Sequence, residues 1–353
     1  MSEQPEIKDI YQRITDKIIA ELEQGTRPWL KPWNAAHLEG RVTMPLRSTG
    51  EPYRGINVIS LWLTASAMGY QCSHWFTFRQ AKELGGSVRK GEKGSPVAFY
   101  STTTAKDADE ETGDETKQRE YGFWKGYTVF NGDQCDGLPA RFFPKPEPIT
   151  TTTAERIESA ERFFSATGGS VKHGGNRAYY SPLTDHIQLP PFETFRDAES
   201  YAATKAHEFV HWTGNAARLD RLSPARFGSE DYAKEELVAE LGAAFLCADL
   251  GITPEPREDH AAYLATWLKR LKDDKRLIFR AASAAQRAAD HLHSYQAKPA
   301  LEAKPEPVAA AEQPKPTPQT AADKQAAYAA SRAARTATWF AGKGGQGASP
   351  GLG

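Results

Sequence analysis

The stretch YAATKAHEFVHWTGN, residues 201–215, decides what fold is expected for the second half of the chain. Its pattern is helical and ends at Gly214, so His207 and His211 share one helix face and can reach one metal ion. Glu208 points into the same cleft, where its carboxylate can act as a general base on a metal-bound water. The pattern HExxH also occurs by chance in unrelated proteins, so the surrounding residues have to support this interpretation.

A second helix, expected at about residues 230–249, carries three carboxylates in the run EELVAELGAAF (235–245). Glu236 and Glu240 are four residues apart and share a face. We expect Glu236 to be the third metal ligand and Glu240 to accept the free ring N–H of a ligating histidine, with the reverse assignment left open. Glu235 lies about 100° away around the helix and is expected to be solvated. The alternative for all three is an ordinary charged helix face.

A zinc ion bound by two histidines and one glutamate keeps its fourth position for water and lowers the pKa of that water to about 7. Two short strands are expected in GNRAYYSPLTDHIQLP (175–190), just before the motif helix. If one strand lines the cleft, Tyr179, Tyr180 or His186 could stabilise an oxyanion. Each of the three has the ordinary alternative of a core or surface residue.

Composition along the chain divides the 353 residues into two domains and a tail. The run FFPKPEPITTTT (142–153) is typical of a linker, and beyond residue 297 Pro, Ala and Gly dominate, as in disordered segments. The expected fold class is α+β, with an amino-terminal α+β domain and a mostly helical second domain that contains a small sheet. The expected segments are domain 1–145, linker 146–153, domain 154–296 and tail 297–353. In the first domain we expect helices at 6–24, 56–68 and 78–84, strands at 96–101 and 123–130, and an acidic loop at 106–120 between the strands.

The same composition argues against several classes of protein. A formal net charge of −1 gives no overall sign of nucleic-acid or membrane binding. No window approaches the ~18 apolar residues of a membrane span, and the first residues do not resemble a secretory signal. The three cysteines are widely spaced and form no CxxC pair, which disfavours disulfides and cysteine zinc clusters. A cytoplasmic protein without a membrane partner is expected.

Residues 41–100 are more basic than the chain as a whole. They contain eight Lys or Arg but only three acids, with aromatic residues between the basic ones. Cations neutralise phosphates and exposed aromatics stack on unpaired bases, so this combination is typical of single-stranded nucleic-acid binding. The alternative is that the aromatics are core and the basic loop at 87–96 is merely solvated. The candidate DNA-binding residues are Arg54, Trp75, Arg79, Lys90 and Lys93.

Several long motifs, in the same order, resemble the ArdC family of plasmid antirestriction proteins over roughly residues 5–293. The motifs similar to its amino-terminal domain are YRGINVISLW (53–62), HWFTFRQAKELGGSVRKGEKGSPVAFY (74–100) and YTVFNGDQCDGL (127–138). Those similar to its zincin-like metallopeptidase domain are NRAYYSPLTDHIQLP (176–190), YAATKAHEFVHWTGNAARLDR (201–221) and YAKEELVAELGAAFLCADLGI (232–252).

The resemblance implies a single-stranded-DNA-binding domain followed by a zinc domain, in a protein that protects incoming plasmid or mobile-element DNA from host restriction. By position it implies that His207, His211 and Glu236 are metal ligands and that Glu208 is the general base. A similarity to thermolysin-like zincins, in which the ligand glutamate precedes an acid by four residues, supports Glu236 as ligand before Glu240.

Three hypotheses share these residues and one Zn²⁺ per chain. The first is a DNA-binding antirestriction protein with a metal site. The second is a zinc metalloprotease that cleaves a host protein, and the third is a non-enzymatic DNA binder whose zinc site is structural or vestigial. Glu208 favours competence for hydrolysis, because structural zinc needs no general base.

Overall fold

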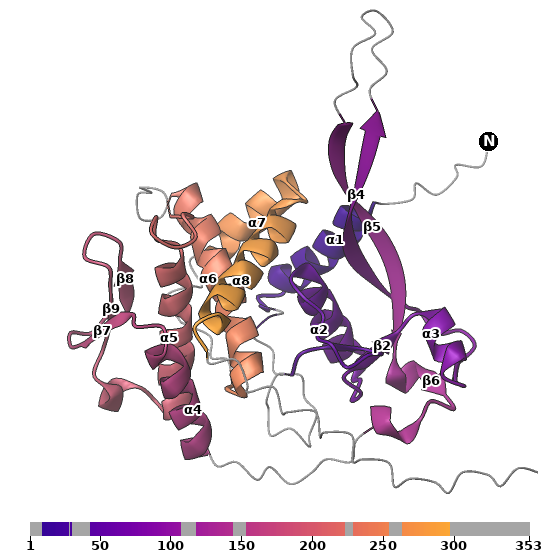
Figure 1. Cartoon of the computed structure of the whole chain (residues 1–353), viewed down its shortest axis with the longest axis horizontal. Coiled ribbons are helices and arrows are strands. Elements are labelled where there is room, and N and C mark those ends of the chain that lie inside the picture. Colours follow the sequence, from indigo (N-terminus) through magenta and orange to yellow (C-terminus); the bar gives the residue numbers. More distant parts are fainter. Residues whose placement is uncertain are drawn as a thin grey trace, which may run out of the picture. The chain divides into compact units, whose positions relative to one another are not determined.

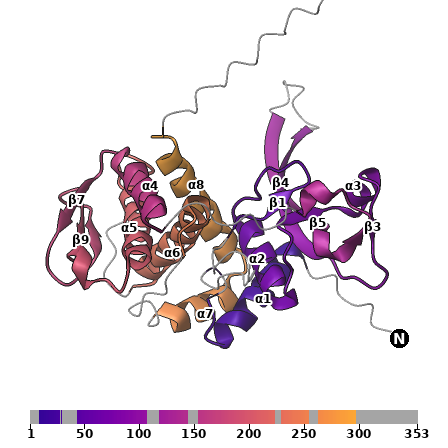
Figure 2. The ribbon, with the colours of Figure 1, turned by 90° about the horizontal axis from the view of Figure 1, so that it is seen from below.

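The computed structural model describes residues 9–27, 29, 43–106, 118–143, 153–222, 229–253 and 263–296 (Figures 1 and 2). Most of the predicted linker, the middle of the predicted acidic loop and the whole predicted tail lie outside these residues. Within the described part of the chain, no helix has the length and apolar character needed to cross a bilayer.

A four-stranded sheet packed with helices forms the amino-terminal region, residues 9–143. Its described α-helices are α1 (Ile10–Glu23), α2 (Ile56–Met68) and α3 (Phe78–Glu83). The strands lie in the spatial order β1 (Leu46–Arg47), β2 (His74–Phe76), β5 (Gln118–Asn131) and β4 (Ser95–Lys106). β1 and β2 are parallel and the other neighbours are antiparallel. A small ladder of β3 (Ser87–Val88) and β6 (Cys135–Asp136) and two 3₁₀ turns, Gly132–Gln134 and Ala140–Phe142, complete the region.

The spacing of apolar residues correctly predicts α1, which buries Ile14, Ile18 and Leu22 and is capped by Asp9. The hairpin of β4 and β5 is longer than predicted. Its register runs without interruption from Ser95↔Val129 to Lys106↔Gln118 and enters residues expected to be loop. The run of threonines and aromatics favours extended backbone there, so strand pairing continues into residues that were expected to be loop.

Five helices and a small sheet form the described part of the carboxy-terminal region, residues 153–296. The helices are α4 (Thr153–Ser165), α5 (Ala198–Thr213), α6 (Glu230–Leu250), α7 (Leu264–Asp273) and α8 (Leu277–His293), with a 3₁₀ turn at Phe192–Thr194. The strands are β7 (Ser170–His173), β8 (Tyr179–Ser181) and β9 (His186–Leu189), with β9 in the centre, parallel to β7 and antiparallel to β8. In both views α6 lies between α5 and α8 (Figures 1 and 2). The predicted α+β class is confirmed.

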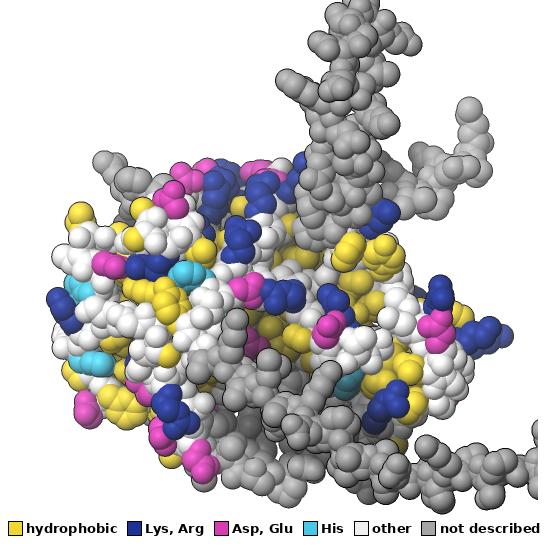
Figure 3. Space-filling model, viewed as in Figure 1, with side chains coloured by type: hydrophobic (Ala, Val, Ile, Leu, Met, Phe, Trp, Pro, Cys, Tyr) yellow, Lys and Arg dark blue, Asp and Glu magenta, His cyan; other side chains and the backbone are white. Residues whose placement is uncertain are grey.

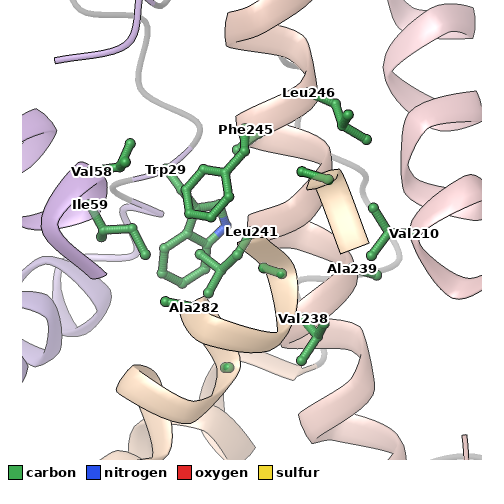
Figure 4. Close-up of a cluster of buried hydrophobic side chains, with 14 of the residues drawn as sticks. Trp29, Val58, Ile59, Val210, Val238, Ala239, Leu241, Phe245, Leu246 and Ala282 are labelled. Atoms are coloured by element: carbon green, nitrogen blue, oxygen red, sulfur yellow. The ribbon is translucent and has the colours of Figure 1, made fainter. Parts of the chain in front are cut away.

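Side chains from both regions meet in one buried cluster. The ring of Trp62 in α2 lies 6.1 Å from that of Phe245 in α6, and Trp29 packs edge-on against Trp267 of α7 at 6.0 Å. The hydroxyl of Thr15 in α1 also donates to the carbonyl of Lys275 at 2.8 Å. The two regions therefore share a core, while the exact domain limits stay a prediction. Figure 4 shows part of this cluster, with Trp29, Val58, Ile59, Val210, Leu241, Phe245 and Ala282 among its labelled members.

Candidate metal centre

Helix α5 carries both histidines of the motif. Its first turn is capped by the carboxylate of Asp197, which accepts from the backbone N–H of Ser200 at 2.7 Å. Its end is closed at Gly214, whose N–H donates to the carbonyl of His211 at 2.8 Å. Between these ends, His207 and His211 face the same side of the helix, and their Nε2 atoms lie 3.1 Å apart. Both imidazoles are largely removed from solvent.

Helix α6 supplies the third group, Glu236. Its Oε2 lies 3.5 Å from Nε2 of His207, and its Oε1 lies 3.5 Å from Nε2 of His211. One ligand atom from each residue lies within 4.8 Å of the others. A tetrahedral ion about 2.0–2.1 Å from each ligand places ligand atoms about 3.3–3.4 Å apart. The two Nε2 atoms are 3.1 Å apart and each has a different oxygen of Glu236 at 3.5 Å, which is close to that spacing, so these three residues fit a small divalent metal ion.

A close approach of α5 and α6 brings the three groups together. Gly242 lies against Val210, and a β-carbon added at Gly242 would lie 2.8 Å from one γ-methyl of Val210 and 3.0 Å from the other. Only a residue without a side chain fits at this crossing. The crossing in turn sets how far Glu236 stands from the histidines on the facing helix.

The charges in the cluster are strongly coupled. Burial alone lowers the pKa of His211, but the carboxylates of Glu236 and Glu235 outweigh that effect and raise it to about 10. Burial alone raises the pKa of Glu236, but His211 and His207 hold it well below its ordinary value. Two buried carboxylates beside two imidazoles make a site in which a cation is favourable.

Glu235 is a partner of the metal cluster, so its predicted solvated position is wrong. Its side chain is only 15% exposed and accepts from Nδ1 of His211 at 3.1 Å. Arg221 donates to both oxygens of Glu235, at 2.8 Å each, and also to the carbonyl of Val210. The two donors keep Glu235 ionised and orient the ring of His211 so that its Nε2 faces Glu236. The prediction failed because α5 crosses α6 so closely that two adjacent glutamates reach one histidine.

Glu240 lies one turn further along α6 and is buried. Its carboxylate accepts from Nε1 of Trp29 and from Nη1 of Arg27, at 3.1 Å each. Both donors belong to the amino-terminal region. Glu236, and not Glu240, stands with the two histidines in the cluster that fits a metal. The expected bond between Glu240 and a ligating histidine stays a prediction.

A cleft of about 1080 Å³ opens over the cluster and is lined by His207, Glu208, His211 and Glu236. Of these four residues, Glu208 is 2% exposed. Tyr232 also lines the cleft and is hydrogen-bonded to Glu236, one turn away on α6. Sequence reasoning missed this tyrosine, although its spacing of four residues from Glu236 was a usable signal.

The predicted oxyanion helpers have different surroundings. Tyr179 lines the cleft and is half exposed. The hydroxyl of Tyr180 donates to Asp185 at 2.7 Å and accepts from Asn215, so its proton is already engaged. Nδ1 of His186 lies 2.6 Å from the hydroxyl of Thr184. Tyr180 lines the cleft as well, and an oxyanion role for any of the three stays a prediction.

The predicted DNA-binding residues differ in burial and in their ion pairs. Trp75 is fully buried in the central strand β2, against Tyr70, so its predicted stacking on bases is wrong. An aromatic in a strand with neighbours on both sides is core unless its face of the sheet is open. Arg54 pairs with Asp290 of α8, and Arg79 pairs with Glu83 on its own helix. The remaining candidates, Lys90 and Lys93, are exposed on the loop before β4.

Comparison with known proteins finds matches over both regions. Residues 8–130 match the N-terminal domain of anti-restriction factor ArdC, and residues 158–284 match a zincin-like metallopeptidase family. The chain is 46% identical over 291 residues to protein y4eC of Sinorhizobium fredii, covering 82% of this chain and 92% of that protein. It is 38% identical over 304 residues to the DNA primase TraC of Escherichia coli, of whose length it spans only 20%.

Two solved structures of the antirestriction protein ArdC from plasmid R388 are also similar. The metal-free structure is 49% identical with a TM-score of 0.68, and the Mn(II)-bound structure is 47% identical with a TM-score of 0.67. Each match covers 82% of this chain and 98% of the solved chain. The likeness therefore includes both the sheet-containing amino-terminal region and the region that holds the histidine pair. The chain belongs to the ArdC family of antirestriction proteins, in which an ArdC amino-terminal domain is joined to a zincin-like metallopeptidase domain.

Proposed function

We propose that this protein binds single-stranded DNA and protects the incoming DNA of a plasmid or mobile element from host restriction, in the cytoplasm of the recipient cell. The observation that carries this proposal is the extent of the likeness to R388 ArdC, which covers 98% of that antirestriction protein. The match to a DNA primase over a similar length supports a role on DNA. If the metallopeptidase domain also cleaves a host protein, that protein is a second partner in addition to DNA.

We propose one Zn²⁺ per chain, held by His207, His211 and Glu236. Two imidazoles and a carboxylate suit zinc, and the Mn(II)-bound relative makes manganese the alternative to test. Metal analysis of the purified chain should find about one zinc per chain, and His207→Ala should lose it. His173→Ala, a histidine bonded to Tyr201 outside the cluster, should keep it. A metal-free wild type, or manganese in place of zinc, would contradict the assignment.

A second function is favoured by Glu208, which is buried beside the three proposed ligands in a cleft large enough for an extended peptide. A bound zinc would supply a Lewis acid and an ionisable water. Glu208 would accept the proton of that water, and Glu235 would hold the ring of His211 in place. This geometry supports a metallopeptidase that cleaves a host protein. The alternative is a binder whose metal site is structural or vestigial.

Glu208→Gln separates these possibilities because it preserves size and should keep the metal. The measurement is the survival of transferred plasmid DNA in a restricting recipient, compared with a non-restricting one. Loss of protection with retained metal and DNA binding would mean that hydrolysis is needed. Full protection would mean that the antirestriction role does not depend on hydrolysis.

DNA binding is tested with the whole chain, because the two regions share a core. The protein should bind a single-stranded oligonucleotide more tightly than the same sequence as duplex, and its affinity should fall as salt rises. Equal affinity for both forms would contradict the preference for unpaired bases.

A further inference from the structure

Two aromatic side chains stand exposed side by side on the β4–β5 hairpin. Phe99 is 56% exposed and Tyr127 is 48% exposed, and their ring centroids lie 6.4 Å apart in an edge-to-face arrangement. Isolated exposed apolar residues are common, but two large aromatic rings in contact offer a continuous apolar surface on which a flat partner can stack. Figure 3 shows hydrophobic side chains gathered on this face, beside the base of the hairpin.

The pair lies where the hairpin leaves the core. Up to Ala98 the outer edge of β4 is covered by α2, because Asn57 bonds both the N–H and the carbonyl of Ala98, at 2.7 and 2.8 Å. Val97 and Val129, the preceding residues on the same face as the pair, are buried. Phe99 and Tyr127 are the next side chains outward on that face, so they continue the apolar row into solvent.

The charge around this pair suits a polyanion. Lys125 stands opposite Phe99 in the hairpin register and is exposed. Residues 93–105 and 121–131 contain Lys93 and Lys125 and no acid, whereas the acids of the same hairpin lie further along the sequence, from Asp107 to Glu120. Lys90 and Lys93, on the loop that leads into β4, are exposed and form no ion pair with any described residue. Lys93 lies six residues before Phe99, about 20 Å along extended backbone, which a few nucleotides span.

We propose that Phe99 and Tyr127 are the platform on which this protein stacks unpaired bases, with Lys125, Lys93 and Lys90 holding the phosphates. The occupant is single-stranded nucleic acid, because bases in a duplex already stack on one another and present few free faces. This inference rests on the proposed single-stranded-DNA binding and assigns it a site. It gives the stacking role to exposed residues in place of the buried Trp75.

The test measures binding of a fluorescein-labelled oligodeoxythymidylate by anisotropy, using the full chain. Phe99→Ala and Tyr127→Ala should each raise Kd about five- to a hundredfold, and Tyr127→Phe should keep most of the affinity because the ring remains. Lys125→Ala should reduce the slope of log Kd against log salt by about one. Phe192→Ala, an aromatic of similar exposure (47%) in the carboxy-terminal region, is the matched control and should bind as wild type.

Thermal unfolding of each variant should match wild type, since neither ring is in the core. If the wild type does not bind the oligonucleotide, the proposed function fails. If the wild type binds and both alanine variants bind equally well, DNA binding stands and this site is overturned. If the alanine variants change the oligomeric state seen by light scattering and leave DNA affinity unchanged, the pair is a protein contact and the inference is overturned.

Discussion

Gly242→Ala should loosen the crossing of the two helices that bring the metal cluster together. An alanine β-carbon would stand 2.8 and 3.0 Å from the γ-methyls of Val210, well inside ordinary van der Waals contact. Val210 is fully buried and β-branched, so its side chain has little freedom to turn away. The helices must therefore separate, and Glu236 on α6 must move away from His211 on α5.

The expected loss of stability is a difference between two opposing effects. Replacing glycine by alanine inside a helix stabilises it by about 1 kcal/mol. Overpacking a filled core costs about 1–3 kcal/mol. A net destabilisation of about 1 kcal/mol follows, equivalent to a fall of about 1–2 °C in Tm for a folded unit that ends at Gln296.

The assay is thermal unfolding, together with metal affinity from a competition titration. Val210→Ala alone should cost about 2 kcal/mol through lost methyls and a cavity. In the double variant the new methyl occupies part of that space. The double variant should therefore lose less stability than the sum of the two single losses, by at least about 0.5 kcal/mol. Ala243→Gly measures the helix-propensity effect at the neighbouring position. Additive losses, or a Gly242→Ala protein about 1 kcal/mol more stable than wild type with unchanged metal affinity, would refute the reasoning.

Other side chains lead to three further expectations. Arg221→Gln removes the fork that holds Glu235, and metal affinity by competition titration should fall about 10–100-fold; an unchanged affinity would mean that Glu235 needs no support. Trp29→Phe removes a hydrogen-bond donor to the buried Glu240, so urea unfolding should show a free energy of unfolding lower by about 1.5–3 kcal/mol. A change near zero would mean that the carboxylate is in contact with water. Burial raises the pKa of the Cys72 thiol to about 11 and raises the pKa values of the other two thiols as well, so little thiolate exists at pH 8. A disulfide reagent should then modify the native chain slowly and all three thiols in denaturant; fast native labelling would contradict their burial.

The residues of the metal cluster that could be predicted are those fixed by spacing within one helix and by the order of the helices along the chain. His207 and His211 are four residues apart, and helix geometry alone puts them on one face. Glu236 could be predicted as the third ligand because a second helix follows α5 in the sequence and carries carboxylates that can reach the two histidines. Glu235, Arg221 and their bonds to His211 could not be predicted, because they depend on how closely α5 and α6 cross, which Gly242 and Val210 decide through a contact 32 positions apart.

The aromatic residues of the amino-terminal region illustrate a different limit. Alternation along a strand shows which side chains share a face, but not which face another element covers. Trp75 lies in a strand with neighbours on both sides and is buried, whereas Phe99 and Tyr127 lie just beyond the reach of α2 and are exposed. Composition alone could not separate these two situations, since all three residues are aromatic and close to cations.

Glu240 explains why the two regions should be regarded as one folding unit. A carboxylate buried in an apolar core is costly unless hydrogen-bonded partners accompany it. The observed donors to Glu240, Trp29 and Arg27, come from the amino-terminal region, and the same helix packs Phe245 against Trp62 of α2. An isolated carboxy-terminal region would lose both donors and would expose part of its core, one turn from Glu236. The matches to y4eC, TraC and R388 ArdC each cover 82% of the chain, which requires both regions together, as expected if the metal helix depends on the amino-terminal region for its stability.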